Sequence, residues 1–536
     1  MNRSLLILVL LTAAAYSGLW NAGFVWDDVP LIVQNQALVE ASVGTLFTND
    51  LWGETGAGAV ASGYFRPLVL LSFMVDRLLF GLSPAGYHFH SLVWHLVAVC
   101  ALYRLMRPLG GATGALVGAT FFALHPVQSE VVSWISARND LMAAAFGFMA
   151  LGMVWDGSRP SRSRWLSALT FTVLAALSKE TAFVLPFLLV VSDFGRGHRE
   201  GWMQRASALC LGVAMVLVFR AYLGVGGEVM PSGKGWMLLG QELWKVVGLF
   251  GGGVWSPWPL SSHHDLTWME VEPLWRILTG LGLVGFLIVM CLLQKGEARR
   301  TMGVGLAWSA FLLAVTFVPI ADKGGFGDRF LYWPLAGMSV ILAGTTGRYW
   351  KWLVRAMAVP AILIIHLRLP DWQHDRSLWG SAIRDVPTST NELSLGHALM
   401  RHDRYKRAHV SFTSSLASGR IDIDACAPLV GSAMRAGMTR QALRMGRWAE
   451  AKGCPVNGTM KGWLAMAAAL EGEWDEAERR AHQEPPDPKL RDIVVSAAVA
   501  KRSGDTDAYA ALLQSWVGTT DLSRQVEVLL EGESSH

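Results

Sequence analysis

Residues 4–28 read SLLILVLLTAAAYSGLWNAGFVWDD, a largely apolar run that ends in two adjacent aspartates, Asp27 and Asp28. The hydrocarbon core of a bilayer requires about 20 apolar residues of helix. Similar apolar runs recur along the chain as far as about residue 370. The sequence therefore predicts an all-α, polytopic transmembrane helical bundle of about eleven spans, of which this stretch is the first.

Basic residues set the expected orientation of these spans. The spans are expected at 4–22, 88–106, 112–125, 140–155, 165–178, 181–194, 206–223, 273–294, 302–320, 329–346 and 352–369. Lys and Arg gather in alternate connecting loops, and such loops stay in the cytoplasm. The long loop 23–87 is acidic and is expected to face the periplasm or the lumen of the endoplasmic reticulum. An odd number of spans places the C-terminal tail on that side too.

Three apolar segments need separate interpretations. Residues 1–20 are expected to remain as a signal anchor rather than to be cleaved as a signal peptide. Residues 66–82 carry charges at helical spacing, which predicts an amphipathic helix on the outer surface. Residues 236–254 are expected to form an interfacial or re-entrant element, because a span there would reverse the orientation of everything downstream.

Composition divides the chain into two parts. It is 52% hydrophobic and 16% charged, whereas soluble domains carry about 25% charged residues. The deficit lies in residues 1–370, and we expect a linker at 371–390 and a soluble helical domain at 391–536 on the outer side. With 46 basic and 42 acidic residues, the net charge of +4 gives no support to nucleic-acid binding.

The tail carries a repeating turn. Turns begin at Asp403, Gly437, Gly472 and, more loosely, Gly504, a spacing close to the period of about 34 residues of tetratricopeptide repeats. We therefore expect a C-terminal α-solenoid of tetratricopeptide-like hairpins, with a generic helical bundle as the alternative. Cys426 and Cys454 are expected to be unpaired buried thiols, or a disulfide if the tail lies in an oxidising compartment.

Ionisable residues at the expected outer edge of the membrane are candidates for function. Adjacent carboxylates suit a general base or a divalent cation, and cations suit a phosphate. The candidates are Asp27 and Asp28 as catalytic residues, Arg138, Lys179 and Arg329 as ligands of a donor phosphate, and His125, Asp140, Glu180 and Tyr332 as supporting residues. Mg²⁺ or Mn²⁺ is a candidate cofactor at the aspartates, and no His/Cys metal spacing is present.

Each candidate also has a structural explanation. The two aspartates could begin a solvated loop, and Arg138 could form a topological salt bridge with Asp140. Lys179 and Glu180 could form an internal ion pair, and Arg329 could anchor a helix that Asp328 caps. His125, followed by proline, is more often a hydrogen-bonded helix-end histidine than a catalytic one.

Several short motifs, taken in order along the chain, carry a resemblance to a known group of proteins. The acidic pair after the first span is similar to the outward acidic motif of the glycosyltransferase C superfamily. The further motifs are FRPL at 65–68, YHFH at 87–90 with Trp94-His95, HPV at 125–127 with RNDL at 138–141, SKET at 178–181, and RFLYWP at 329–334. The ordered set resembles the transmembrane-and-tetratricopeptide-repeat O-mannosyltransferases and their bacterial relatives. The resemblance implies a polyprenyl- or dolichyl-phosphate-linked mannose as donor and a protein hydroxyl as acceptor.

The resemblance also implies that the first acidic residue of the pair, here Asp27, acts as the base. The family pair is Asp-Glu, so the choice between Asp27 and Asp28 stays open. The leading hypothesis is an inverting sugar transfer at the outer face, with the bilayer and a peptide acceptor, held by the tail, as partners. The alternatives are a non-enzymatic scaffold that recruits partners through the tail, and a transporter, which the scarcity of mid-span charges disfavours.

Overall fold

The computed structural model is mostly helical and separates into two compact units, Met1–Val386 and Pro387–His536. Each unit is described by itself. The described residues are 3–40, 43–52, 63–225, 233–256, 260, 264–265, 274–323, 325–345, 350–417, 423–454, 456, 458–481 and 503.

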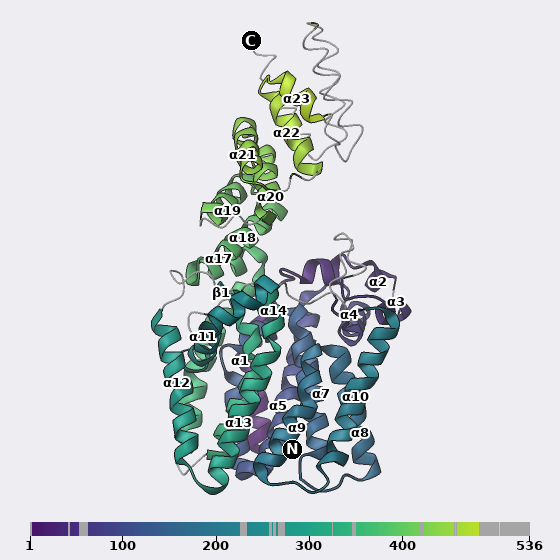
Figure 1. Ribbon diagram of the computed structural model, residues 1–536, viewed down its shortest axis with the longest axis vertical. Helices are drawn as coiled ribbons and strands as arrows, with labels where there is room; N and C mark the ends of the chain where they lie inside the picture. The colour runs from purple at the N-terminus through teal and green to yellow at the C-terminus, as the bar shows by residue number, and fades with distance from the viewer. Residues whose placement is uncertain are drawn as a thin grey trace. The chain divides into compact units, whose positions relative to one another are not determined.

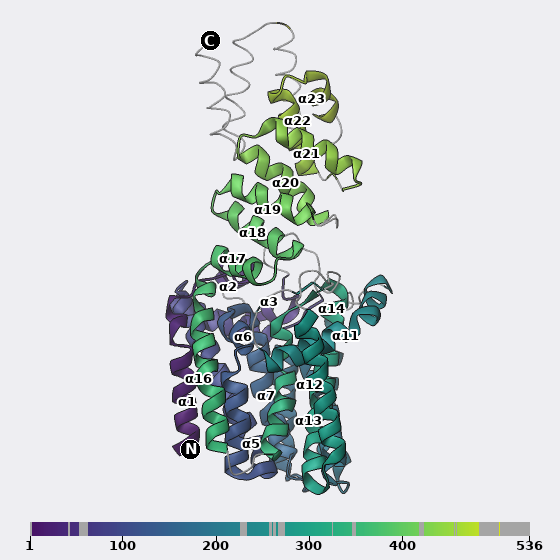
Figure 2. The same cartoon turned by 90° about the vertical axis from the view of Figure 1, so that its left-hand side faces the viewer.

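The first unit is a bundle of long helices that run side by side (Figures 1 and 2). Each expected span overlaps at least one described helix. The N-terminal half contains α1 (Arg3–Ala15), η1 (Ser17–Asn21), η2 (Val29–Val33), α2 (Gln36–Val39), α3 (Val43–Thr48), α4 (Pro67–Phe80), α5 (Pro84–Leu124), α6 (Gln128–Ser133), η3 (Ile135–Ala137), α7 (Arg138–Val154), α8 (Arg162–Ser178), η4 (Glu180–Val184), α9 (Leu185–Arg196) and α10 (Trp202–Leu223). The C-terminal half contains α11 (Gly233–Trp255), α12 (Leu274–Leu293), α13 (Gly296–Val315), α14 (Phe317–Lys323), η5 (Asp328–Leu331), α15 (Pro334–Thr345), α16 (Trp350–Arg368), η6 (Leu369–Gln373) and α17 (Asp375–Asp385), with the short strands β1 (His264–Asp265) and β2 (Gly325–Phe326).

Four helical stretches are long and apolar enough to cross a bilayer, judged by length and composition among the described residues. They are Arg3–Asn21, Pro84–Leu124, Trp202–Leu223 and Leu274–Leu293. Many of their large apolar side chains point outward, among them Leu10, Val218 and Leu293, as expected where the surrounding solvent is lipid. The protein is an integral membrane protein. The count of about eleven spans stays a prediction.

Close helix packing depends on glycine at two places. In α5 the backbone leaves the helical conformation at Gly110 and Gly111, which separates the two spans expected at 88–106 and 112–125. A Cβ at Gly110 would lie 1.8 Å from the carbonyl oxygen of Ala343 in α15. Where α13 passes α15, a Cβ at Gly305 would lie 2.5 Å from the carbonyl oxygen of Gly337. Small residues let the backbones of membrane helices approach in this way.

Two expectations about the first unit need correction. The helix expected at 66–82 is present as α4, but its charges do not all face solvent, because Asp76 is fully buried against Arg138. Part of the expected linker 371–390 is helical, since η6 and α17 belong to the first unit. The segment expected at 236–254 forms one helix, α11.

The described part of the second unit consists of six helices, and three of the connections between them are short described turns. These helices are α18 (Ser389–Arg401), α19 (Tyr405–Ala417), α20 (Ile423–Arg435), α21 (Thr439–Ala451), α22 (Gly458–Leu470) and α23 (Trp474–Ala481). Asp403, Gly437 and Gly472 all have positive φ, which is a common way to end a helix. The alanine five residues after each of them is fully buried, namely Ala408, Ala442 and Ala477. The turn expected at Gly504 lies outside the described residues.

The expectation of unpaired thiols in the tail is wrong. Cys426 and Cys454 form a disulfide, with 6.3 Å between their Cα atoms. The sequence could not decide between the two states, because the pairing depends on how α20 and the turn after α21 approach each other. Cys100, Cys210 and Cys291 are free.

Candidate functional site

The acidic pair lies in a tight turn between η1 and η2, where the Asp28 N–H donates to the Val25 carbonyl oxygen at 2.9 Å. Asp28 is fully buried. Its Oδ1 accepts hydrogen bonds from the backbone N–H of Ser136 at 2.8 Å and from the Ser136 hydroxyl at 2.5 Å, and its Oδ2 accepts from the Val25 N–H at 3.1 Å. Asp27, by contrast, is half-buried. The two neighbours therefore occupy different environments.

Trp26, just before the pair, has an unusual backbone conformation. Its φ is +54°, a left-handed value that costs free energy for any residue with a Cβ. Its backbone N–H donates to the Asp375 carboxylate at 2.6 Å, and its indole stacks on Trp134 with 4.4 Å between ring centroids. These contacts hold the strained residue, and the turn that follows it, in one conformation.

Arg329 joins the same cluster from a distant part of the chain. Its guanidinium carbon lies 5.3 Å from the Trp26 ring centroid and 5.6 Å from that of Trp134, within cation–π range. Glu130 fixes its position by accepting from the Arg329 guanidinium at 3.1 Å and from the Arg329 backbone N–H at 3.0 Å. The acidic turn, the 130–136 segment and the 328–330 segment thus converge on one place.

Glu130 and Trp134 belong to this cluster, although neither was among the candidate residues chosen from the sequence. The sequence drew attention to the HPV motif at 125–127 just before them, but only its histidine was a candidate. A carboxylate and an aromatic side chain between two expected spans were the available signals. Burial raises the pKa of Glu130, whereas Arg329 acts in the opposite direction.

The structure does not present Arg138 as a ligand for a phosphate. Its side chain is fully buried, and it pairs with Asp76 at 2.5 Å. It also donates to the hydroxyls of Ser91 and Ser72 and to the Tyr87 carbonyl oxygen. With its donors taken by these groups, Arg138 anchors α7 against α4 and α5. Arg138 also does not form the salt bridge to Asp140 that the sequence suggested, because Asp140 pairs with Lys179.

Lys179 and Glu180 form ion pairs, but not with each other. Lys179 Nζ lies 2.5 Å from Asp140 Oδ2, whereas Glu180 contacts Arg66 at 3.0 Å and Arg220 at 3.4 Å. Asp140 is in the first turn of α7, four residues after Ser136, which binds Asp28. The N-terminal turn of α7 therefore links the acidic turn to this second cluster of charges.

His125 and Tyr332 are buried and make contacts inside the bundle. His125 is buried and its Nε2 lies 3.3 Å from the Val254 carbonyl oxygen, which agrees with a hydrogen-bonded helix-end histidine. The Tyr332 hydroxyl lies 3.0 Å from His95 Nδ1, and both side chains are fully buried. Neither residue is brought to the cluster around Trp26.

The donor atoms at the acidic turn do not fit a divalent cation well. Both carboxylate oxygens of Asp28 already accept hydrogen bonds, whereas Mg²⁺ needs several free oxygen ligands at short distance. Among the described residues, no group of three or more His, Cys, Asp or Glu side chains is arranged to hold a metal ion. We therefore derive no chemical step through a cation.

Comparison with known proteins shows which proteins this chain resembles. Residues 70–223 match the family model described as dolichyl-phosphate-mannose-protein mannosyltransferase. Protein O-mannosyl-transferase TMTC3 of Mus musculus is 25% identical over 84% of this chain and 54% of its own length. Protein O-mannosyl-transferase Tmtc2 of Drosophila melanogaster is 32% identical over 39% of this chain and 24% of its own.

The chain is thus similar to protein O-mannosyl-transferases, as the order of its motifs indicates. It spans about half the length of the first of these relatives. Among solved structures, ArnT from Cupriavidus metallidurans bound to undecaprenyl phosphate aligns with 13% identity over 81% of this chain and 78% of its own, with a TM-score of 0.40. That likeness is too distant to support an argument about the site.

Proposed function

We propose that this protein transfers a sugar, mannose in the first instance, from a polyprenyl-phosphate donor to a hydroxyl group of a protein acceptor at the periplasmic or lumenal face. The observation that carries the proposal is the convergence of the acidic turn, Glu130 and Arg329 at one end of the bundle. The family match over residues 70–223 supports the same chemistry.

Asp27 is the general base in this proposal. The acceptor oxygen attacks the anomeric carbon, its proton passes to the Asp27 carboxylate, and the bond from that carbon to the phosphate oxygen breaks, so that configuration is inverted. Asp28 is a positioning residue, because its oxygens are occupied by Val25 and Ser136. A general base typically contributes about 10²–10⁴-fold to the rate.

Arg329 stabilises the phosphate that leaves with the polyprenyl chain. Its side chain is 19% exposed, and fixed charges aimed at a developing anion lower the barrier. Lys179, 18% exposed beside Asp140, is the second candidate. Arg138, with no exposed surface, has no such role, and it acts instead by holding α7 in place.

The proposal includes the topology of the chain. About eleven spans would place the N-terminus in the cytoplasm and both the acidic turn and the tetratricopeptide-like tail outside. The disulfide between Cys426 and Cys454 supports an oxidising compartment for the tail. A helical solenoid there is suited to hold an extended acceptor peptide.

Donor turnover by the purified protein tests the proposal. A panel of polyprenyl-phosphate sugars would be incubated with the protein and a Ser/Thr-containing peptide, with a nucleotide-linked mannose as the control donor. We expect release of polyprenyl phosphate and label on a peptide hydroxyl with the mannose donor. Consumption of the nucleotide-linked sugar alone, or of no donor, would contradict the proposal.

A further inference from the structure

A cavity of about 520 Å³ lies among α1, α5 and α7, away from the acidic turn. Its walls are apolar along most of their length, with Val9, Val93, Val97 and Met149 among the lining residues. Charged side chains line it too, namely Arg104, Asp156 and Arg164. Val93 is 37% exposed and Gly152 is exposed, so the cavity reaches the surface of the bundle.

The dimensions of the cavity match one leaflet of a bilayer. Val93 and Arg104 are 104 − 93 = 11 residues apart in α5, a rise of about 16 Å. This is about half of the 30 Å hydrocarbon core. With the arginine at the edge of the membrane, the apolar end of the cavity therefore lies near the middle of the bilayer.

The cavity is distinct from the site around Asp28. His88, near the start of α5, lies 3.3 Å from the Gly23 carbonyl oxygen, close to the acidic turn. Arg104 follows 104 − 88 = 16 residues later in the same helix, about 24 Å further along its axis. The charged mouth is therefore on the side of the arginine-rich loops, which the charge pattern predicts to be cytoplasmic.

The mouth of the cavity, formed by Arg104, Asp156 and Arg164, carries one positive charge in excess. Arg164 pairs with Asp156 at 2.8 Å, whereas Arg104 has no hydrogen bond or ion pair within the described part of the chain and is exposed. Two arginines and one aspartate give a net charge of +1, which complements the single negative charge of a phosphodiester. Basic pockets between membrane helices on the cytoplasmic side suit anionic lipid head groups.

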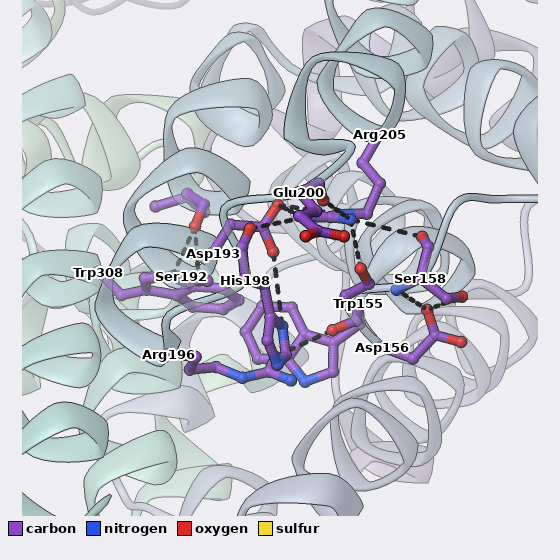
Figure 3. Close-up of polar contacts among 12 residues, drawn as sticks. Trp155, Asp156, Ser158, Ser192, Asp193, Arg196, His198, Glu200, Arg205 and Trp308 are labelled. Atoms are coloured by element: carbon purple, nitrogen blue, oxygen red, sulfur yellow. Dashed lines mark hydrogen bonds and ion pairs between the residues drawn. The ribbon is translucent and has the colours of Figure 1, made fainter. Parts of the chain in front are cut away.

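A network of hydrogen bonds holds the segment that carries Asp156, one side of the mouth, in place (Figure 3). Arg205 is fully buried and donates to the carbonyl oxygens of Gly157 at 2.5 Å and His198 at 2.8 Å, while pairing with Asp193 at 2.8 Å. Arg196 donates to the Trp155 carbonyl oxygen at 3.0 Å. The segment that carries Asp156 is therefore fixed before any ligand arrives, which reduces the entropy lost on binding.

We propose that this cavity binds an anionic glycerophospholipid of the cytoplasmic leaflet, with an acyl chain along the apolar walls and the phosphodiester at Arg104. Arg164, already tied to Asp156, lines the same mouth. The site is independent of the sugar transfer proposed above and would hold a structural lipid at the opposite end of the bundle.

Two variants and one control test the proposal. A Cβ added at Gly152 meets no other atom within 4 Å, so Gly152→Leu should fill the cavity without disturbing the helix. Arg104→Gln removes the charge at the mouth. Arg107→Gln removes an exposed charge of the same helix that does not line the cavity. Each purified protein would be stripped of lipid and titrated with phosphatidylglycerol or with phosphatidylcholine of the same chains, with native mass spectrometry as the readout.

We expect wild type and Arg107→Gln to bind phosphatidylglycerol more tightly than phosphatidylcholine. Arg104→Gln should weaken phosphatidylglycerol binding about tenfold, the loss of one charge-assisted contact, and Gly152→Leu should weaken both lipids. Equal binding by all four proteins, or tight retention of a polyprenyl phosphate in place of the phospholipid, would overturn the proposal. Because sugar transfer is not measured, this result is independent of the proposed activity.

Discussion

At the scale of single residues, burial separates two neighbouring aspartates of the same chemical type. Asp28 is enclosed and accepts three hydrogen bonds, and Asp27 is half-buried. The sequence predicted the importance of the pair from its place after the first span. It could not assign the roles, because Ser136, the partner that distinguishes them, is 108 residues away along the chain.

Replacing Asp28 by Asn should destabilise the turn. An amide offers one acceptor oxygen where the carboxylate offers two, so a donor at Val25 or Ser136 would lose its partner. We expect a loss of about 1–3 kcal/mol in the free energy of unfolding, measured by thermal or denaturant unfolding in detergent. Asp27→Asn is the matched control and should unfold like wild type. Equal stability of both variants would contradict this assignment.

The environment of Asp28 also predicts a pH dependence. Burial raises the pKa of Asp28 to about 7, although the hydrogen bonds from Ser136 and Val25 oppose the shift. A raised carboxyl pKa means that the folded state prefers the protonated form. The resulting stabilisation is complete below the ordinary pKa of about 4 and is lost as pH rises through about 7.

The melting temperature should accordingly fall between about pH 4 and pH 7 and level off above that, and this fall should be absent from Asp28→Asn. Thermal unfolding across that range, at constant ionic strength, is the measurement. A step of the same size in both proteins would assign the titration to another group.

At the scale of elements, the contact between α4 and α7 depends on the buried pair of Asp76 and Arg138. Removing one partner of such a pair leaves an uncompensated charge, which costs about 3–5 kcal/mol. Arg138→Met should therefore lower stability by that order, and the double variant with Asp76→Leu should regain most of it. A denaturant titration of the two proteins and wild type measures the difference. A stable Arg138→Met protein with weakened donor binding would restore the role in phosphate binding.

The elements show which parts of the site the sequence could predict. The apolar runs predicted the helices, because the thickness of the membrane sets the length of a helix that spans it. Pairing between charges was predicted poorly, because Lys179, Glu180 and Arg138 pair with residues that lie about 40 or more positions away along the chain. Proximity along the chain suggested Lys179 with Glu180 and Arg138 with Asp140, but helix packing brings together residues that are far apart in sequence.

At the scale of the whole molecule, the tail depends on its disulfide for part of its stability. Closing a loop across 28 positions is worth about 3 kcal/mol. Cys426→Ser should lower the unfolding midpoint of the tail, whereas Cys210→Ser, at an exposed free thiol, should not. Alkylation under native conditions provides a second readout, because Cys426 and Cys454 should react only after reduction. Reaction of both thiols without reductant would place the tail in a reducing compartment and contradict the proposed topology.

The turn repeat of the tail was predictable from local chemistry. Asp403, Gly437 and Gly472 share a left-handed backbone, for which glycine and, among other residues, aspartate are best suited. The disulfide was not predictable in the same way, because it depends on packing between hairpins and on the redox state of the compartment.

In the proposed mechanism, Asp27 removes the proton from the acceptor during sugar transfer. The most direct test is the rate of polyprenyl-phosphate release from polyprenyl-phosphate mannose by wild type, Asp27→Asn and the control Glu40→Gln, which changes an exposed carboxylate of the same loop. We predict that Asp27→Asn lowers the rate about 10²–10⁴-fold at unchanged abundance and melting temperature, and that Glu40→Gln leaves it unaltered. Full turnover by a folded Asp27→Asn protein would contradict the account.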